Sequence, residues 1–317
     1  MNKFIFLLFI TLIFSCAKTP VETPFDHNSS LQGKIYFESS TPDTTIANVT
    51  LYQQEQGIKI ATTQSDNQGN FEFTDITASV YQLLITGTGF EDKYISGITV
   101  KANDTTRLDS IFLAKIKPIE HKKMIIDGVI DEGLQPVYQN TNQSNWSGSN
   151  DFENLYITRD DDSLYIAVSG GFDAGGNCVN IYIDTDGNKD TGINDFSQIS
   201  GGDIGAHLNK NVNVAVDFGA DIAFSQWALA SEIGVVSLSN PGAVDENIIN
   251  SNIVVNSSVI EFAISLKALY PTGELPLKIS LVAIIGGGDS AHFANDTIPQ
   301  QSENFDGTFK SVFSRNY

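Results

Sequence analysis

Residues 180–192 read Asn-Ile-Tyr-Ile-Asp-Thr-Asp-Gly-Asn-Lys-Asp-Thr-Gly, and the second half of the chain is organised around them. Val179, Ile181 and Ile183 alternate with polar or aromatic neighbours. An apolar side chain at every second position is typical of a β-strand with one buried face. The stretch therefore predicts a half-buried strand that runs directly into an acidic turn.

The turn after this strand carries an oxygen-bearing side chain at every second position. Alternate residues of a tight loop face inward, so their oxygens can converge on one hard cation such as Ca²⁺. An EF-hand loop uses a similar set of oxygens, but it needs glycine at its sixth position, where this chain has Lys189. We predict an EF-like Ca²⁺ loop; the alternative is a solvated β-turn whose acidic side chains cap their own backbone. The predicted ligands are Asp184, Asp186, Asn188, Asp190 and Asp195.

The composition sets broad limits on domain number and function. The chain has 317 residues, of which 41% are hydrophobic, so it has room for two domains with substantial cores. Its formal net charge is −20. A nucleic-acid-binding protein needs a basic surface for the phosphates, so this charge argues against that class. The acidity is consistent with an exported protein that tolerates or binds divalent cations.

The N-terminus has the features of an export signal. A positive start is followed by an apolar run at residues 4–14, which is too short to span a bilayer comfortably. Residues 12–16 read Leu-Ile-Phe-Ser-Cys and resemble the lipobox of bacterial lipoproteins. The resemblance implies that residues 1–15 are a signal peptide and that Cys16 is acylated, for example with palmitate. An ordinary secretory signal that happens to contain a cysteine is the alternative.

If Cys16 is acylated, the chain is anchored by lipid in the cell envelope, and we expect the outer membrane of a Gram-negative bacterium. Buried acyl methylenes hold such an anchor in the bilayer. Residues 16–30 contain two prolines and several Ser and Thr residues. They are expected to form an extended tether.

Residues 31–115 contain short apolar stretches at regular spacing, separated by polar turns, and this pattern predicts a β-sandwich. Four motifs resemble those of the carboxypeptidase regulatory-like family. They are Gly-Lys-Ile at 33–35, a Thr-to-Phe turn at 63–71, Tyr-Gln-Leu at 81–83 and Gly-Phe at 89–90. The resemblance implies a transthyretin-like, seven-stranded sandwich without catalysis. In its central turn, Asp66 is expected to accept backbone hydrogen bonds and Gly69 to adopt positive φ.

Residues 116–317 are expected to form one larger β-sandwich, which makes the chain all-β, with two β-sandwich domains in tandem after a lipoprotein signal peptide. Strands at 154–158 and 163–168 flank a polar turn and predict a hairpin. Further strands are predicted at 212–218, 233–238, 248–253, 259–264 and 277–285, with a short helical turn at 265–270.

Three motifs of this second part resemble family 9 carbohydrate-binding modules and the related DOMON-like sandwiches. They are Ile-Asp-Gly-Val-Ile-Asp-Glu at 126–132, Leu-Tyr-Ile-Ala-Val at 164–168, and Ile-Asp-Thr-Asp at 183–186 with Thr-Gly at 191–192. The chain departs from the pattern at Leu134, near the place where the opening motif usually has tryptophan. The resemblance implies a sandwich that binds carbohydrate through an aromatic clamp.

The two tryptophans of the chain, Trp146 and Trp227, are the candidate carbohydrate-binding residues. Sugar C–H faces pack on aromatic rings, while sugar hydroxyls bond Asn, Asp and Gln side chains. Trp146 lies in a polar stretch, which favours exposure, and the alternative is an indole packed under its own loop. Trp227 lies in a more apolar stretch, which favours a core position over exposure to a ligand.

Two common catalytic motifs are missing from the sequence. The sequence contains no His-Glu-x-x-His zinc motif and no Gly-x-Ser-x-Gly elbow. We therefore predict a non-enzymatic surface lipoprotein that binds glycan through its second domain, with Ca²⁺ supporting the fold. Two alternatives remain open: an adhesion or structural module with protein partners, and an enzyme of unknown class on the second domain.

Overall fold

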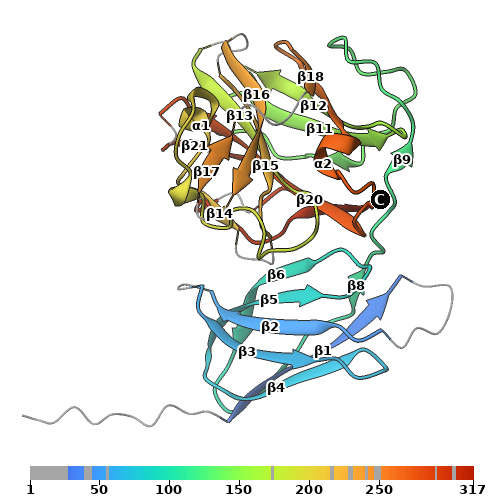
Figure 1. The fold of residues 1–317 in the computed structure, drawn as a ribbon. Helices are drawn as coiled ribbons and strands as arrows, with labels where there is room; N and C mark the ends of the chain where they lie inside the picture. Colours follow the sequence, from blue (N-terminus) through green and yellow to red (C-terminus); the bar gives the residue numbers. More distant parts are fainter. Residues whose placement is uncertain are drawn as a thin grey trace, which may run out of the picture.

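The computed structural model describes residues 28–38, 45–54, 57–172, 175–214, 218–227, 231–239, 242–245, 251–289, 291–301 and 305–317. These residues are mostly strands and turns, and they form two β-sandwich domains in tandem (Figure 1), as predicted. The predicted signal peptide, Cys16 and most of the predicted tether lie outside the described residues.

The first domain contains two four-stranded sheets in its described part. One has the order β4-β1-β7, with β8 also paired to β1, and the other has the order β3-β2-β5-β6. The sequence patterns did not predict β7, which pairs with β1 in parallel. The strands are β1 (Ser29–Phe37), β2 (Asn48–Gln53), β3 (Lys59–Gln64), β4 (Asn70–Ile76), β5 (Ser79–Thr86), β6 (Lys93–Val100), β7 (Thr105–Arg107) and β8 (Ile111–Leu113).

The polar turn before β4 has the predicted geometry. Asp66 Oδ1 accepts hydrogen bonds from the backbone N–H groups of Gln68 (2.9 Å) and Asn70 (2.8 Å). Gly69 has φ +82°, and a Cβ there would lie 2.0 Å from the carbonyl oxygen of Ile35. Only glycine allows β1 to approach the turn this closely.

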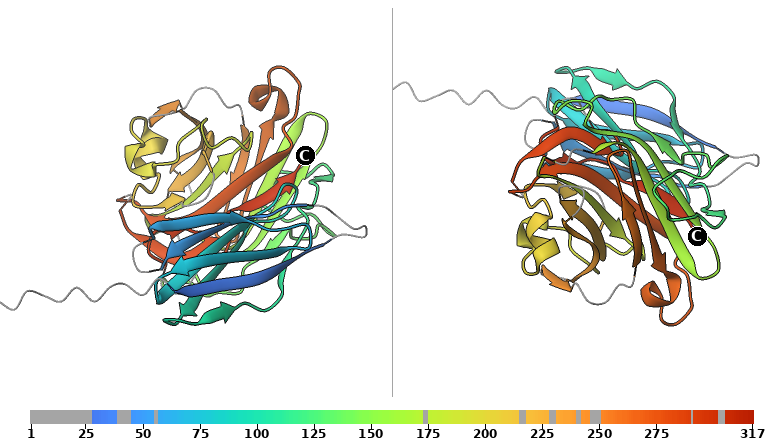
Figure 2. Two further views of the ribbon diagram at one scale, coloured as in Figure 1. Left: turned by 90° about the horizontal axis from the view of Figure 1, so that it is seen from below. Right: turned by 90° about the horizontal axis from the view of Figure 1, so that it is seen from above.

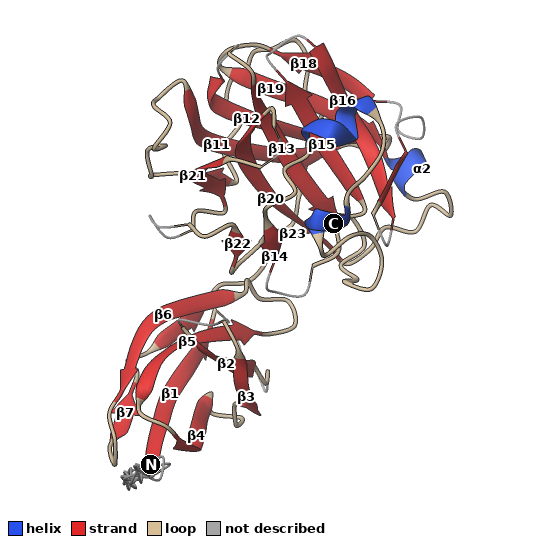
Figure 3. Ribbon diagram, turned by 90° about the vertical axis from the view of Figure 1, so that its left-hand side faces the viewer, coloured by secondary structure: helices blue, strands red, loops and turns tan. Residues whose placement is uncertain are grey.

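The second domain is built from two larger sheets that face each other (Figures 2 and 3). The six-stranded sheet has the order β10-β11-β12-β19-β18, with β9 paired to β11. Its strands are β9 (Glu120–His121), β10 (Tyr138–Gln139), β11 (Asn150–Arg159), β12 (Ser163–Phe172), β18 (Ser251–Val255) and β19 (Val259–Ser265). The predicted hairpin is confirmed, since β11 and β12 pair antiparallel.

The seven-stranded sheet has the order β17-β16-β15-β13-β20-β21, with β23 paired to β20. Its strands are β13 (Asn177–Asp184), β15 (Ile222–Trp227), β16 (Ser231–Ser239), β17 (Ala243–Asp245), β20 (Lys278–Gly287), β21 (Phe293–Ile298) and β23 (Phe313–Asn316). The sequence patterns did not predict β15, β17, β21 and β23.

The remaining elements of the second domain are short. They are the 3₁₀ helix η1 (Phe196–Gln198), α1 (Asp203–His207), β14 (Asn213–Val214), α2 (Leu266–Leu269) and β22 (Thr308–Phe309). The predicted helical turn at 265–270 is α2. The stretch predicted as a strand at 212–218 forms only the two-residue β14 in its described part. Among the described residues, no helix combines the length and apolar character that crossing a bilayer requires.

The main core of the second domain lies between its two sheets. The apolar positions of β11, β12 and β19 point toward those of β13, β15 and β20. Phe224 of β15 and Phe262 of β19 stack across the layer, with ring centroids 4.7 Å apart and an interplanar angle of 2°. Both side chains are fully buried. Burying an aromatic side chain of this size removes about 150–250 Å² from water, so this contact helps to hold the two sheets together.

The prediction that β13 is half-buried is wrong, because the strand is buried on both faces. Its polar or aromatic positions, Asn180, Tyr182 and Asp184, are 0%, 0% and 1% exposed. The long connection from β13 to β15 folds back over the outer face of the sheet and forms a second apolar cluster there, which includes Phe196, Leu208 and Phe218. The face that the alternation pattern assigned to solvent is therefore an interior surface.

The two domains are in direct contact. Leu84 of the first domain is 7% exposed and belongs to the second apolar cluster of the second domain, and Tyr94 packs against the same cluster. Arg315 is 5% exposed and lies 3.2 Å from Glu91 of the first domain. The linker is fixed as well, because the backbone N–H of Ile119 donates to the carbonyl oxygen of Asn316 in β23 (2.7 Å).

Residues 126–132, which contain the opening motif of the second domain, are held against the outer face of the six-stranded sheet. Glu261 of β19 is fully buried, and its Oε2 accepts hydrogen bonds from the backbone N–H groups of Asp127 (3.1 Å) and Gly128 (2.7 Å). Its Oε1 has no hydrogen-bond partner within the described residues. Burial raises the pKa of Glu261, and the nearby charges of Asp127 and Asp131 add to this effect.

Glu261 should therefore make the second domain less stable as the pH rises. A carboxyl group with a raised pKa in the folded state holds its proton more tightly there, so stability falls as the pH rises from the ordinary value of 4.5 through the raised folded value. We expect Glu261→Gln to flatten this part of the pH dependence. Urea unfolding midpoints at about pH 4.5 and 7, followed by tryptophan fluorescence, check this, because both tryptophans lie in the second domain.

The matched control is Glu132→Gln, which removes an exposed carboxylate from the same segment. It should leave the pH dependence of the midpoint unchanged. An equal midpoint difference between the two pH values in Glu261→Gln and in the unmodified chain would contradict the expectation.

Candidate functional site

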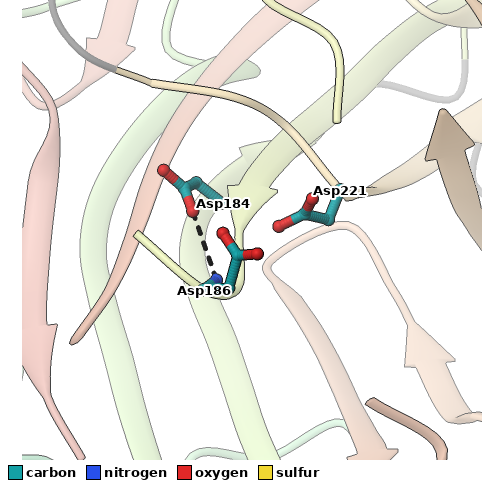
Figure 4. A group of neighbouring side chains, drawn as sticks. All are labelled: Asp184, Asp186 and Asp221. Carbon is teal, nitrogen blue, oxygen red and sulfur yellow. Dashed lines mark hydrogen bonds between the residues drawn. The ribbon is translucent and has the colours of Figure 1, made fainter. Parts of the chain in front are cut away.

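Three carboxylates meet at one end of β13. The strand ends at Asp184, and Ile183 pairs with Ile222 of antiparallel β15, so Asp221 lies beside the start of the acidic turn. Carboxylate oxygens of Asp184, Asp186 and Asp221 all lie within 4.8 Å of one another. Figure 4 shows the three residues at the strand end, in the turn and in the segment before β15.

Glycines bring the segment before β15 close enough to the turn. A Cβ on Gly219 would lie 2.1 Å from the carbonyl oxygen of Thr191, and a Cβ on Gly192 would lie 2.3 Å from that of Ala220. Ile193 and Ala220 exchange two backbone hydrogen bonds, each 2.8 Å long. The turn and the segment therefore form a tight pair that fixes the position of Asp221.

Each of the three carboxylates is also held by hydrogen bonds. Asp184 Oδ1 accepts from the backbone N–H groups of Asp186 (3.2 Å) and Gly187 (2.6 Å). Asp221 Oδ2 accepts from the backbone N–H and the hydroxyl of Thr185, at 2.8 and 2.9 Å. Asp186 accepts from the hydroxyl of Thr191 at 3.0 Å. A carboxylate has about four acceptor sites, so these bonds leave lone pairs available to a cation.

The negative charges of this cluster repel one another. Burial raises the pKa of Asp184 to about 6, and the charges of Asp221 and Asp186 add to this rise. Burial also raises the pKa of Asp221, with a further contribution from Asp186. Burial and the neighbouring carboxylates thus disfavour the charged forms of Asp184 and Asp221 when no cation is bound. The donor set consists of oxygen alone, which fits a hard cation such as Ca²⁺ or Mg²⁺.

The predicted ligand set agrees with this cluster in two residues. Asn188 Oδ1 accepts a hydrogen bond from the backbone N–H of Asp190 (3.1 Å), and both residues are exposed. Asp195 caps η1, where it accepts hydrogen bonds from Ser197 and Gln198. Asp221 was not predicted. If β15 had been recognised as the antiparallel neighbour of β13, Asp221 would have been placed opposite Asp184.

Trp227 lies at the other end of β13. It is the last residue of β15 and pairs in register with Cys178, near the start of β13. Its indole is half-buried, stacks on His207 with ring centroids 4.9 Å apart, and donates from Nε1 to the carbonyl oxygen of Gly176 (3.0 Å). The indole is therefore fixed at the rim of the sheet.

Trp146 reaches the same end of the sandwich from the loop before β11. It is half-buried and packs against the core between the two sheets. Its carbonyl oxygen accepts from Asn150 Nδ2 at 3.5 Å, and Asn150 Oδ1 accepts from Asn177 Nδ2 at 2.6 Å. Asn177 follows Gly176, the acceptor for Trp227. The structure thus brings both predicted ligand-binding tryptophans to the edge where β13 begins.

Amide side chains are concentrated around Trp146. Asn145 and Asn295 exchange hydrogen bonds between backbone N–H groups and side-chain oxygens, at 2.9 and 3.1 Å. The backbone N–H of Trp146 donates to Ser144 Oγ at 3.1 Å. This edge therefore combines aromatic faces with amide and hydroxyl groups.

Several solved structures resemble parts of the chain. A type II cohesin–X-dockerin complex from Acetivibrio cellulolyticus is 20% identical, with a TM-score of 0.24, and the alignment covers 28% of this chain and 60% of that one. A family 9 carbohydrate-binding module from Caldicellulosiruptor kristjanssonii in complex with glucose is 13% identical, with a TM-score of 0.27, over 56% of this chain and 82% of that one.

A DUF3823 family protein from Parabacteroides merdae is 8% identical, with a TM-score of 0.22, over 85% of this chain and 96% of that one. TM-scores this low do not identify a shared function. No curated protein matches the chain. The family model of the carboxypeptidase regulatory-like domain matches residues 30–113. The first domain is thus similar to carboxypeptidase regulatory-like domains, in agreement with its sequence motifs.

Proposed function

We propose that this protein is a non-catalytic, surface-anchored protein that captures glycan with its second domain, at the edge where Trp146 and Trp227 lie. One observation carries the proposal: two half-buried indoles from distant parts of the chain are fixed at one edge of the same sandwich, linked through residues 176–177. The motifs at 126–132, 164–168 and 183–192 support it, because they resemble those of carbohydrate-binding sandwiches.

The chemistry of this edge suits a sugar. An indole face takes up the C–H face of a sugar ring, and a half-buried indole loses little side-chain freedom when it does so. Neighbouring amides such as Asn145 and Asn295 offer donors and acceptors for hydroxyl groups. A few oriented polar groups beside aromatic surface are the usual composition of a small-molecule site.

A glycan array tests the proposal. We expect the unmodified protein to bind a limited set of glycans and Trp146→Ala to lose at least about fivefold in affinity, because stacking on an aromatic face is worth about 1 kcal/mol or more. Ile60→Ala, which removes an exposed apolar side chain from the first domain, is the control and should bind normally. Absence of binding to every glycan on the array would contradict the proposal and favour an adhesion module with protein partners.

We also propose that Ca²⁺ supports the second domain at Asp184, Asp186 and Asp221. When bound, the ion supplies positive charge that offsets the repulsion among the three carboxylates. The three residues themselves join the end of β13, the acidic turn and the start of β15. Holding them together would stiffen this corner of the sandwich.

Calcium should raise the unfolding temperature of the second domain. A ligand that binds only the folded state, at 100 times its Kd, stabilises it by about 2.7 kcal/mol, which corresponds to a shift of several degrees in a domain of this size. We expect Asp221→Asn to lose most of this shift, measured by thermal unfolding with Ca²⁺ and with EDTA.

Asp190→Asn is the matched control for this measurement. It makes the same charge change on an exposed position of the same turn and should keep the full shift. Equal shifts in both variants would contradict the three-residue site. If Ca²⁺ neither raises the unfolding temperature of the unmodified protein nor releases or absorbs heat on titration, the calcium proposal is wrong.

We propose finally that Cys16 carries the lipid that anchors the protein in the outer membrane. The lipobox-like residues 12–16 and the tether-like residues that follow support this. Cells labelled with radioactive palmitate should yield a labelled protein, and Cys16→Ala should remove the label and release the protein from the membrane fraction. An unlabelled parent protein would instead favour an ordinary secretory signal.

A further inference from the structure

A cleft of about 830 Å³ lies where the two domains meet. Strands β5, β6 and β8 of the first domain form one wall, and residues 300–311 of the second domain contribute described residues to the other. Neither tryptophan and none of the acidic-turn residues lines it. Its volume falls in the range of about 300–1,000 Å³ that is usual for ligand sites.

An exposed aromatic residue lines the first-domain side of the cleft. Phe112 of β8 is 63% exposed, although its neighbours Ile111 and Leu113 are buried in the core. Its ring stacks on Tyr36 with centroids 5.3 Å apart and an interplanar angle of 24°. The stack restricts the orientation of the Phe112 ring while leaving much of its surface accessible, which is what a flat platform for a sugar ring requires.

Two amide side chains beside this platform have unused donors. Gln82 Oε1 accepts from the hydroxyl of Tyr94, and Gln54 Oε1 accepts from the backbone N–H of Gly97 at 2.6 Å. Neither Nε2 has a hydrogen-bond partner within the described residues. Each amide is thus oriented through its oxygen, and its two remaining N–H groups can donate to a ligand.

Hydrogen bonds fix the opposite wall, and ion pairs neutralise acidic residues of the lining. Gln301 is held at both ends of its amide, by Lys310 N (2.8 Å) and by the carbonyl oxygen of Pro299 (2.9 Å). Asp306 lies 3.8 Å from Lys310 Nζ, and Glu91 lies 3.2 Å from buried Arg315. The lining carries the acids Glu91, Asp92 and Asp306 and the lysines Lys93 and Lys310. With Arg315 paired to Glu91, these charges nearly cancel, so the cleft favours a neutral ligand.

The cleft is formed before a ligand arrives. The burial of Leu84 in the second domain and the ion pair of Arg315 with Glu91 fix the two walls relative to each other. Arg315 is held further by the carbonyl oxygen of Val137, to which it donates at 2.7 Å. A preformed site avoids the cost of ordering two domains on binding.

We infer that this cleft is a second glycan site, built jointly by the two domains, that takes a neutral oligosaccharide of a few residues. A sugar ring stacks on Phe112, and its hydroxyls accept from the amides of Gln54 and Gln82. The inference rests on the proposed function for the class of ligand, but the residues differ entirely from those at the tryptophan edge.

The test is isothermal titration of the full chain with cellotetraose, xylotetraose, mannotetraose and maltotetraose. For at least one of them we expect Phe112→Ala to weaken binding at least about tenfold and Gln82→Ala at least about threefold. Ile60→Ala removes an exposed apolar side chain of the first domain that does not line the cleft, and it serves as the control, with less than about a twofold effect. Trp146→Ala should likewise leave this binding within about twofold.

Binding that is lost in Trp146→Ala and unchanged in Phe112→Ala and Gln82→Ala would overturn the cleft site and leave the proposed function standing. No heat with any of the four sugars would also overturn the cleft as a site for neutral oligosaccharides. The glycan array still decides the proposed function in that case, because it samples charged and branched glycans as well.

Discussion

Burial of β13 on both faces is the constraint on which the second domain depends. A strand in this position must satisfy the polar groups of its outer face inside the protein, because an unpaired buried polar group costs about 1–3 kcal/mol. Tyr182 donates to the carbonyl oxygen of Asn209 at 2.8 Å, and Asn180 bonds the carbonyl oxygen of His207 and the hydroxyl of Ser225. The connection that covers the strand therefore also supplies Asn209 and His207 as hydrogen-bond partners, and the neighbouring β15 supplies Ser225.

This constraint explains which parts of the fold the sequence could predict. Strands with local period-two alternation, such as β11, β12 and β19, were predicted because their pattern depends on near neighbours alone. The outer face of β13 was misjudged, because Asn180, Tyr182 and Asp184 look like solvent-facing residues until their partners are known. The partners of Asn180 and Tyr182 lie at least 27 residues further along the chain.

The same reasoning applies to the carboxylate cluster. Asp184 and Asp186 were predicted from the spacing of one turn, which is local information. Asp221 belongs to the cluster only because β15 pairs with β13 and because Gly192 and Gly219 permit the close approach. Asp195 was assigned to the loop by its spacing, but a helix cap uses its carboxylate. Spacing along the chain identifies an acidic turn, and strand pairing decides which acids face each other.

The two ends of β13 separate the proposed cation from the proposed sugar edge. Cys178, which pairs with Trp227, and Asp184 are six residues apart along the strand, which spans about 20 Å at 3.3 Å per residue. A cation at the acidic end is therefore too far away to touch a sugar on the indoles. Its proposed contribution is to fix the corner where β13 and β15 meet. Because β15 carries Trp227 at its far end, a rigid pairing of these two strands sets the position of that indole.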